Sequence, residues 1–209
     1  MLYELSHFVK THLGFVWEGV EWMNAVVFHL QHKNAKQVIS SILQKHSVRF
    51  TIERVDLQDI PALAEFFASQ PKSAYEFFHP HDFDAATLTK LVKRKSFLMF
   101  IIKEKDDIVG YFFLRCFMNG NSFKGRIVDY PHRNQGIAKV MGTVINDIVL
   151  ALNLKLFTTI SPDNYASLAS TKAVNDIRIV RTLENGFYYI ECTPKPVNTT
   201  DIVRNGEGG

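Results

Sequence analysis

The chain has 209 residues, 46% of them hydrophobic, which suffices for one globular domain with additions or at most two small domains. Its formal net charge of +3 is mild, and its one compact basic run, at 93–95, is typical of a solvated helix end, so nucleic acid is not expected as a partner. Cys116 and Cys192 lie in apolar, strand-like stretches. We therefore expect reduced core cysteines in a cytoplasmic protein, with neither a disulfide framework nor a zinc site.

Residues 1–46 are predicted to form an N-terminal aromatic helical extension. Apolar residues recur at helical spacing over 13–30, and additional aromatic residues spread over much of the helix circumference. Two glutamates interrupt this stretch and no basic region precedes it, so neither a secretory signal nor a spanning helix is expected. Three interpretations stay open: packing against the parent domain, contact in a homodimer, or peripheral contact with the inner face of a membrane.

Residues 47–193 carry alternating strand and helix patterns, and residues 194–209 are polar and rich in proline and glycine, which predicts a flexible tail. In chain order we predict a strand, two helices joined by an aromatic and histidine-rich loop, a hairpin, a short strand, a long helix, a strand, a short helix and a last hairpin. The predicted strands occupy 48–55, 97–102, 108–117, 123–128, 155–160, 177–183 and 187–192.

This order of elements predicts the fold class. A strand, a long helix and another strand in succession form a parallel crossover unit, whereas the hairpins are antiparallel. We therefore expect an α/β (α+β) fold with a mixed, mostly antiparallel sheet that has a central parallel strand pair and flanking helices, preceded by the N-terminal helical extension.

The stretch from Val128 to Ala138, V-D-Y-P-H-R-N-Q-G-I-A, joins the short strand to the long helix. The first N–H groups of a helix lack intrahelical partners and the helix dipole is positive there, so this loop suits a phosphate or pyrophosphate. Gly136 has no Cβ and permits a close approach by a ligand. Arg133 can add a charge-assisted contact.

Three residues of this loop, Arg133, Gly136 and Ala138, occupy the fixed positions of the signature R/Q-x-x-G-x-G/A, and Gln135 stands at a variable position within it. With it the chain resembles the GNAT superfamily of acyl-CoA-dependent N-acetyltransferases over roughly residues 50–192. The resemblance implies that acetyl-CoA is the co-substrate and lies where two parallel strands splay apart. It implies cofactor contacts from the strand end, the loop and an asparagine after the second strand, namely Val128, Arg133, Asn134, Gln135, Gly136, Ile137, Ala138 and Asn164.

The catalytic groups are less well defined by the resemblance. The family's usual general acid is a tyrosine seven residues after the asparagine, and this chain has Thr171 there. Tyr165 is a candidate replacement, and Asp129 and His79 are candidate bases for the acceptor amine. Each has a structural alternative: Tyr165 as a packed side chain, Asp129 as a turn-capping carboxylate and His79 as the rim of a loop that plugs into the domain.

The loop between the first two helices borders the acceptor pocket in the family, so Phe78, His79 and His81 are the expected acceptor contacts. Two histidines without a third ligand are weak support for a metal, and no metal is expected.

The resulting functional hypothesis is a GNAT-type acetyltransferase that acylates a small-molecule amine, for example an amino sugar in surface-polysaccharide synthesis. Two alternatives stay open. One is a non-catalytic acyl-CoA-binding or interaction module with a degenerate active site, and the other is a protein N-terminal or lysine acetyltransferase.

Overall fold

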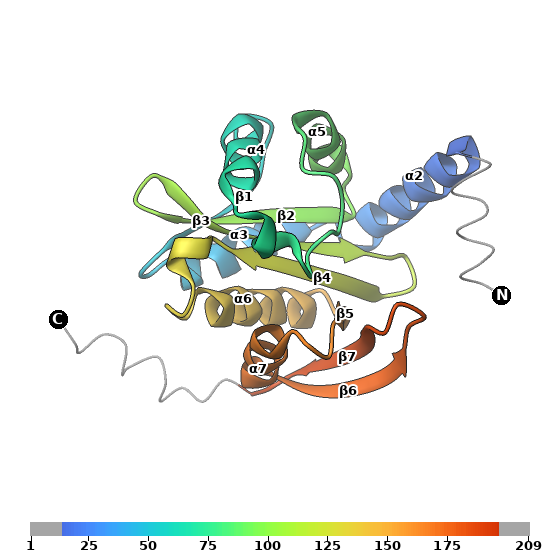
Figure 1. Cartoon of the computed structure of the whole chain (residues 1–209). Coiled ribbons are helices and arrows are strands. Elements are labelled where there is room, and N and C mark those ends of the chain that lie inside the picture. Colours follow the sequence, from blue (N-terminus) through green and yellow to red (C-terminus); the bar gives the residue numbers. More distant parts are fainter. Residues whose placement is uncertain (1–13, 197–209) are drawn as a thin grey trace.

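The computed structural model describes residues 14–196, so the start of the predicted extension and most of the predicted tail lie outside the described residues. Seven strands form one sheet in the order β1-β2-β3-β4-β5-β7-β6 (Figure 1). Neighbouring strands are antiparallel except for the parallel pair β4 and β5. The predicted mixed sheet with a central parallel pair is confirmed.

The elements follow the predicted order along the chain. The strands are β1 (Thr51–Arg54), β2 (Phe97–Glu104), β3 (Asp107–Cys116), β4 (Asn121–Val128), β5 (Lys155–Ile160), β6 (Asn175–Thr182) and β7 (Tyr188–Pro194). The helices are α2 (Gly14–Gln31), α3 (Ala35–His46), α4 (Ile60–Ser69), α5 (Ala85–Lys93), α6 (Ile137–Ala151) and α7 (Tyr165–Val174), with two short 3₁₀ helices, η1 (Lys72–Tyr75) and η2 (Tyr130–His132).

The first strand is shorter than the predicted 48–55. Val48 is 90% exposed, and the Ser47 hydroxyl accepts a hydrogen bond from the Ile52 N–H, so the chain turns before it joins the sheet. The predicted start of α5 is correct, because the Asp84 carboxylate accepts hydrogen bonds from the N–H groups of Ala86 and Thr87.

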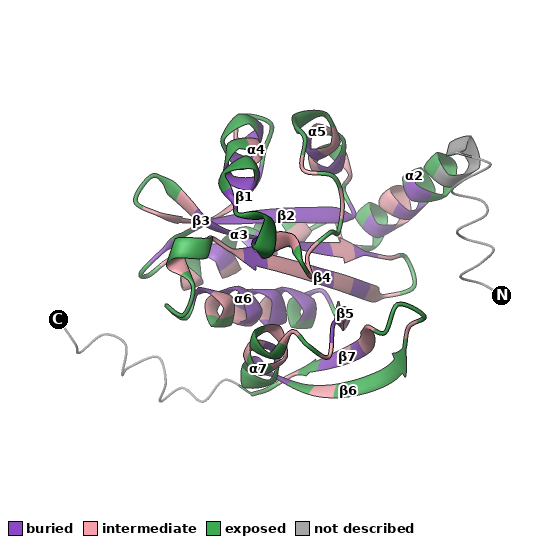
Figure 2. Ribbon diagram, in the orientation of Figure 1, coloured by how far each residue is buried: buried purple, intermediate pink, exposed green. Residues whose placement is uncertain are grey.

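Helices cover both faces of the sheet, so two cores form. Helices α4 and α5 pack on one face and α3 and α6 on the other. Strand β2 is apolar on both sides because its side chains alternate between the two cores. Strand β6, at the sheet edge, is largely exposed (Figure 2).

Helix α2 contacts the rest of the domain through polar groups and through Phe28, which is buried. The Asn24 side chain donates to the Cys116 carbonyl (2.9 Å) and accepts from the Met118 N–H (2.8 Å), and the Glu21 carboxylate pairs with Arg115. Its apolar side chains are partly left in solvent, and Trp22 is 70% exposed. Among the described residues, no helix is long and apolar enough to cross a membrane.

Helix α3 completes the core beneath the sheet. Ile39 and Leu43, together with Phe28 of α2, are buried in the same cluster as the apolar residues of α6. The predicted extension of residues 1–46 therefore contributes side chains to the main core.

This packing predicts that Ile39→Ala lowers the free energy of unfolding by about 2–5 kcal/mol, because the side chain is 1% exposed and its removal leaves a cavity. Urea unfolding measures the change, with the exposed neighbour Ser40→Ala as the control. An effect below about 0.5 kcal/mol would mean that α3 is not part of the cooperative core.

Candidate functional site

Strands β4 and β5 separate after three residue pairs. Pairing joins Asn121–Phe123 of β4 to Lys155–Phe157 of β5. Beyond it, the Thr158 hydroxyl donates to the Lys124 carbonyl (3.2 Å), and no further β4 residue has a β5 partner within the described chain. Strand β4 remains paired with β3 up to Val128. One backbone edge of β4 is therefore available to an extended ligand.

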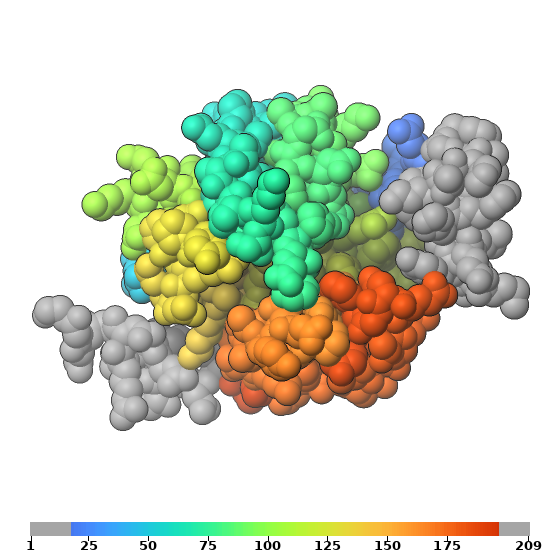
Figure 3. Space-filling model, viewed as in Figure 1, coloured from blue at the N-terminus to red at the C-terminus, as the bar shows by residue number. Residues whose placement is uncertain are grey.

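A cavity of about 950 Å³ lies where the two strands separate. Its walls are the freed part of β4, the end of β5, the loop before α6, the start of α7, the segment between η1 and α5, and the β6–β7 turn. Figure 3 shows the segment near residue 80 reaching toward α7 and the β6–β7 turn, with β4 in the hollow behind it.

The loop before α6 has the backbone of an anion site. Gly136 is the N-cap of α6 and has φ +82°, and Asn134 has φ +64°, so two left-handed residues bend the chain over the helix start. No atom lies within 4 Å of the position that a Cβ on Gly136 would occupy. Arg133 and Lys139 line the cavity on either side of this helix start. The arrangement suits a pyrophosphate.

Most of the expected cofactor contacts come together at this cavity. Its lining includes Val128, Arg133, Asn134, Gly136, Ile137, Ala138 and Asn164. Gln135 does not line it, because its side chain and carbonyl accept hydrogen bonds from Arg49 (3.4 Å each). The Asn164 side-chain oxygen caps α7 by accepting from the Ser167 N–H (3.0 Å).

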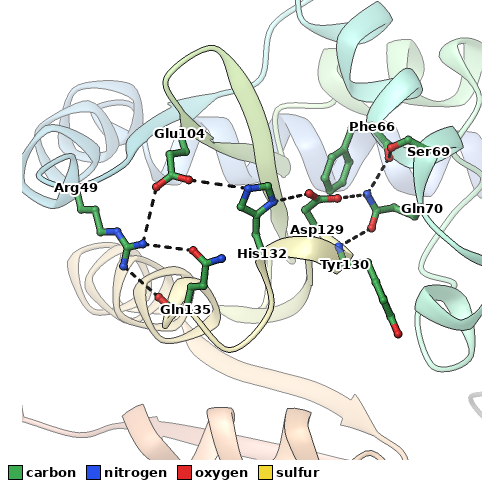
Figure 4. A network of polar contacts seen from close by, with 9 residues as sticks. All are labelled: Arg49, Phe66, Ser69, Gln70, Glu104, Asp129, Tyr130, His132 and Gln135. Carbon is green, nitrogen blue, oxygen red and sulfur yellow. Dashed lines mark hydrogen bonds and ion pairs between the residues drawn. The ribbon is translucent and has the colours of Figure 1, made fainter.

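Asp129 takes part in a polar network behind the loop (Figure 4). One carboxylate oxygen accepts from the Gln70 amide, and the other lies 2.6 Å from His132 Nδ1. Gln70 also accepts from the Tyr130 N–H (3.0 Å). Asp129 does not line the cavity, whereas His132 does. The carboxylate thus links α4 to the loop that follows β4.

The aromatic loop places its histidines in different surroundings. Phe78 and His79 line the cavity. His81 does not, because its ring packs among aromatic residues, donates from Nδ1 to the Asp82 carbonyl (2.8 Å) and accepts at Nε2 from the Tyr111 hydroxyl (3.1 Å). Burial lowers the pKa of His81, so the imidazole is held neutral.

Thr171 is 1% exposed, and its hydroxyl accepts a hydrogen bond from Arg126 (3.0 Å). Tyr165, at the start of α7, lines the cavity and is 75% exposed. A buried threonine bonded to a guanidinium is not a general acid at neutral pH.

Two charged residues of the site, Lys124 and Arg126, were missed by the sequence reasoning. Both belong to β4 and line the cavity. Their positions, two residues apart on a predicted strand, place both side chains on the same face of the sheet. That pattern was the feature of the sequence from which this pair of cations could have been found. Among the described residues, no cluster of three or more metal-ligating side chains occurs.

Comparisons with known proteins place this geometry in a known fold. No protein-family model and no curated protein matches the chain. Among solved structures, the GNAT domain of PAT from S. lividans matches with TM-score 0.59 and 11% identity over 68% of this chain and 89% of that chain. The PaiA N-acetyltransferase from Thermoplasma acidophilum in complex with coenzyme A matches with TM-score 0.58 and 11% identity, over 71% and 100%.

A third match is the acetyltransferase from Salmonella typhimurium that modifies the N-terminal serine of ribosomal protein L7/L12, with TM-score 0.57 and 14% identity over 73% of this chain and 98% of that chain. At these identities the likeness concerns the fold. The chain therefore has the GNAT fold, as its loop signature predicts.

The polar network predicts that Asp129→Ala lowers the free energy of unfolding by about 1–3 kcal/mol, because Gln70 and His132 lose a shared acceptor. Urea unfolding of the single and double variants with Gln70→Ala should give a coupling energy of about 0.5–3 kcal/mol. Asp163→Ala, which removes an exposed carboxylate from the cavity wall and leaves the polar network intact, is the control. Unchanged stability with loss of turnover would instead make Asp129 a catalytic base.

The partly buried imidazole of His81 predicts a pH effect. The pKa of His81 is lowered from its ordinary value of 6.5, so the unfolded chain binds its proton more readily and stability is lost as the pH falls below about 6.5. The difference in the free energy of unfolding between wild type and His81→Gln should therefore become smaller as the pH is lowered from 7 to 5. Urea unfolding at each pH measures it, and a gap that widens on acidification contradicts the buried neutral imidazole.

Proposed function

We propose that this protein is an acyl-CoA-dependent N-acyltransferase that transfers an acetyl group from acetyl-CoA to an amine. The observation that carries the proposal is the separation of β4 from β5, which leaves an unpaired backbone edge leading from a helix start to the interior of the cavity. The fold adds support, since the matched structures include GNAT acetyltransferases and one is a coenzyme A complex.

The residues present fit acetyl-CoA. The first N–H groups of α6, with Arg133 and Lys139 beside them, suit a pyrophosphate, and Gly136 lets it approach the backbone. The unpaired edge of β4 offers N–H and C=O groups to an amide-containing arm such as pantetheine. The thioester supplies the activated acyl group for transfer.

The chain's own residues orient the reactants and handle the amine proton. Direct transfer needs a neutral amine next to the thioester carbonyl, and His79 in the cavity wall is the candidate base, directly or through water. Asp129 is a weaker candidate, since both of its oxygens are engaged by Gln70 and His132. Tyr165 is the candidate proton donor at the start of α7.

The proposed acceptor is a small amine, and an amino sugar in surface-polysaccharide synthesis is the working example. Phe78 and Phe123 in the cavity wall offer flat apolar surfaces for a ring. A protein N-terminus or lysine is the alternative acceptor, and the Salmonella neighbour modifies an N-terminal serine. Trp22 and Leu30, exposed on α2, support a homodimer or a peripheral contact at the inner face of a membrane, in a cytoplasmic protein.

The rival function is a non-catalytic acyl-CoA-binding module. The observation in its favour is Thr171, which stands where the family has its acid and is bonded to Arg126. Release of free CoA from acetyl-CoA in the presence of an amino sugar or a peptide N-terminus separates the two functions. Saturable binding without any release across both acceptor classes supports the rival.

Calorimetric titration tests the cofactor site. Gly136→Glu should abolish acetyl-CoA binding, because it puts a carboxylate where the pyrophosphate lies. Gly120→Glu is the matched control, since Gly120 also has a positive φ (+78°) and open space at its Cβ position but does not line the cavity. Wild-type affinity in a folded Gly136→Glu variant would refute the assignment of the loop.

A further inference from the structure

The slot between β4 and β5 has two cations in its wall. Lys124 and Arg126 alternate with their neighbours along β4 and therefore point to the same side of the sheet, toward α6 and α7. Lys124 is 3% exposed, and its Nζ has no oxygen or nitrogen partner among the described residues, with the Cys192 thiol as the polar group beside it. Both residues line the cavity that is assigned to acetyl-CoA.

Arg126 is held by three oxygen atoms from two helices. Its guanidinium donates to the Ala138 carbonyl at the start of α6 (2.6 Å) and to the hydroxyls of Ser170 (2.7 Å) and Thr171 (3.0 Å) in α7. All three acceptors are neutral. The guanidinium thus bridges the two helices that flank the slot while keeping its full charge.

Gly142 makes room for this guanidinium. A Cβ at Gly142 would lie 3.0 Å from an Arg126 Nη atom and 2.7 Å from a methyl group of Val174. Glycine inside a helix costs about 1 kcal/mol relative to alanine, so a helix-interior glycine here is explained by the close approach of α6 to Arg126 and α7.

The two charges lack a counter-ion. Neither residue forms an ion pair with a described carboxylate. Burial lowers the pKa of Lys124 to about 8 and that of Arg126 to about 10. Cys192 is the ionisable group beside both, and burial raises the pKa of its thiol, so it stays neutral. Cations held in the fold without a counter-ion favour the binding of an anion.

We propose that Arg126, supported by Lys124, stabilises the sulfur of CoA as a thiolate, so that acyl transfer needs no general acid at the position of Thr171. The proposal rests on the function proposed above. The pyrophosphate is accounted for by the helix start, Arg133 and Lys139 at the rim, whereas Lys124 lies next to the last β4–β5 pair, at the inner end of the slot. The sulfur is the group of CoA that becomes anionic there.

The step balances without a proton donor. The lone pair of the amine forms a bond to the thioester carbonyl carbon, and the C–S bond breaks with its electron pair passing to sulfur. The amine proton goes to a base or to water. The thiolate stays paired with Arg126 until CoA leaves, and it takes a proton from water in solution. Charge stabilisation of this kind replaces general acid catalysis.

Comparing the affinities of CoA and acetyl-CoA isolates the effect, because only CoA can ionise at sulfur. An adjacent cation lowers an acid's pKa by about 1–3 units, and a free thiol has a pKa of about 8.5. Calorimetric titration should therefore show the CoA to acetyl-CoA affinity ratio of the wild type rising about tenfold or more between pH 6 and pH 9. Acetyl-CoA affinity itself should follow a different and weaker pH profile.

Variants assign the effect to the cations. Arg126→Met should flatten the rise of the CoA to acetyl-CoA affinity ratio with pH, and Arg126→Lys should restore part of that rise. Lys124→Met should reduce the ratio mainly below pH 8, where the amine of Lys124 is charged. Lys139→Met is the matched control, since it removes a cation from the cavity rim and should weaken both ligands without changing their ratio. Ultraviolet absorbance of bound CoA near the thiolate band gives an independent readout.

Two outcomes would overturn the proposal. A wild-type ratio that does not change with pH, while acetyl-CoA still binds, refutes the thiolate site and leaves the proposed function intact. The second outcome concerns the Arg126→Met variant. If this variant keeps the wild-type ratio of CoA to acetyl-CoA affinity but discriminates less between succinyl-CoA and acetyl-CoA, the cations bind an acyl carboxylate instead. Failure of wild type to bind either ligand would refute the proposed function as well.

Discussion

The candidate site depends on one constraint, the separation of β4 from β5 after only three residue pairs. Parallel neighbours normally pair along their length, and each unpaired backbone group buried by the fold would be costly. Here the Thr158 hydroxyl satisfies the Lys124 carbonyl at the branch point, and the remaining edge of β4 faces a cavity of about 950 Å³. Pairing with β3 continues up to Val128, so the strand that presents the freed edge is held along its other edge.

The loop between β4 and α6, at the end of that edge, is held in place by contacts on the side away from the cavity. Gln70, the C-cap of α4, bonds to Asp129 and to the Tyr130 N–H. Arg49, between α3 and β1, bonds to Gln135 and lies 3.8 Å from Glu104 of β2. These contacts come from segments on both sides of the sheet (Figure 4). The left-handed residues of the loop thus have external support, which local strain of this kind requires.

Local sequence patterns were sufficient to predict the strand, loop and helix around Gly136, because apolar periodicity and a glycine N-cap act within a few residues. They could not predict that His81 turns into the aromatic core beside Tyr111, since both histidines of the loop have the same local context. Nor could they predict that α2 docks through Glu21 and Asn24, because their partners, the Arg115 guanidinium and the Cys116 carbonyl, lie about ninety residues away in sequence. Side-chain function in this site is decided by such distant neighbours.

The charges of Lys124 and Arg126 are relevant to the question of whether the slot between β4 and β5 binds a ligand. A chain with no anion to bind would be more stable with apolar residues in place of Lys124 and Arg126, since replacing buried charges by well-packed hydrophobic groups is often stabilising. The fold instead provides a helix glycine at 142 and hydroxyls at 170 and 171 to accommodate one of them. Thr171 takes part in this accommodation, because its hydroxyl accepts a hydrogen bond from the guanidinium and so helps to orient it.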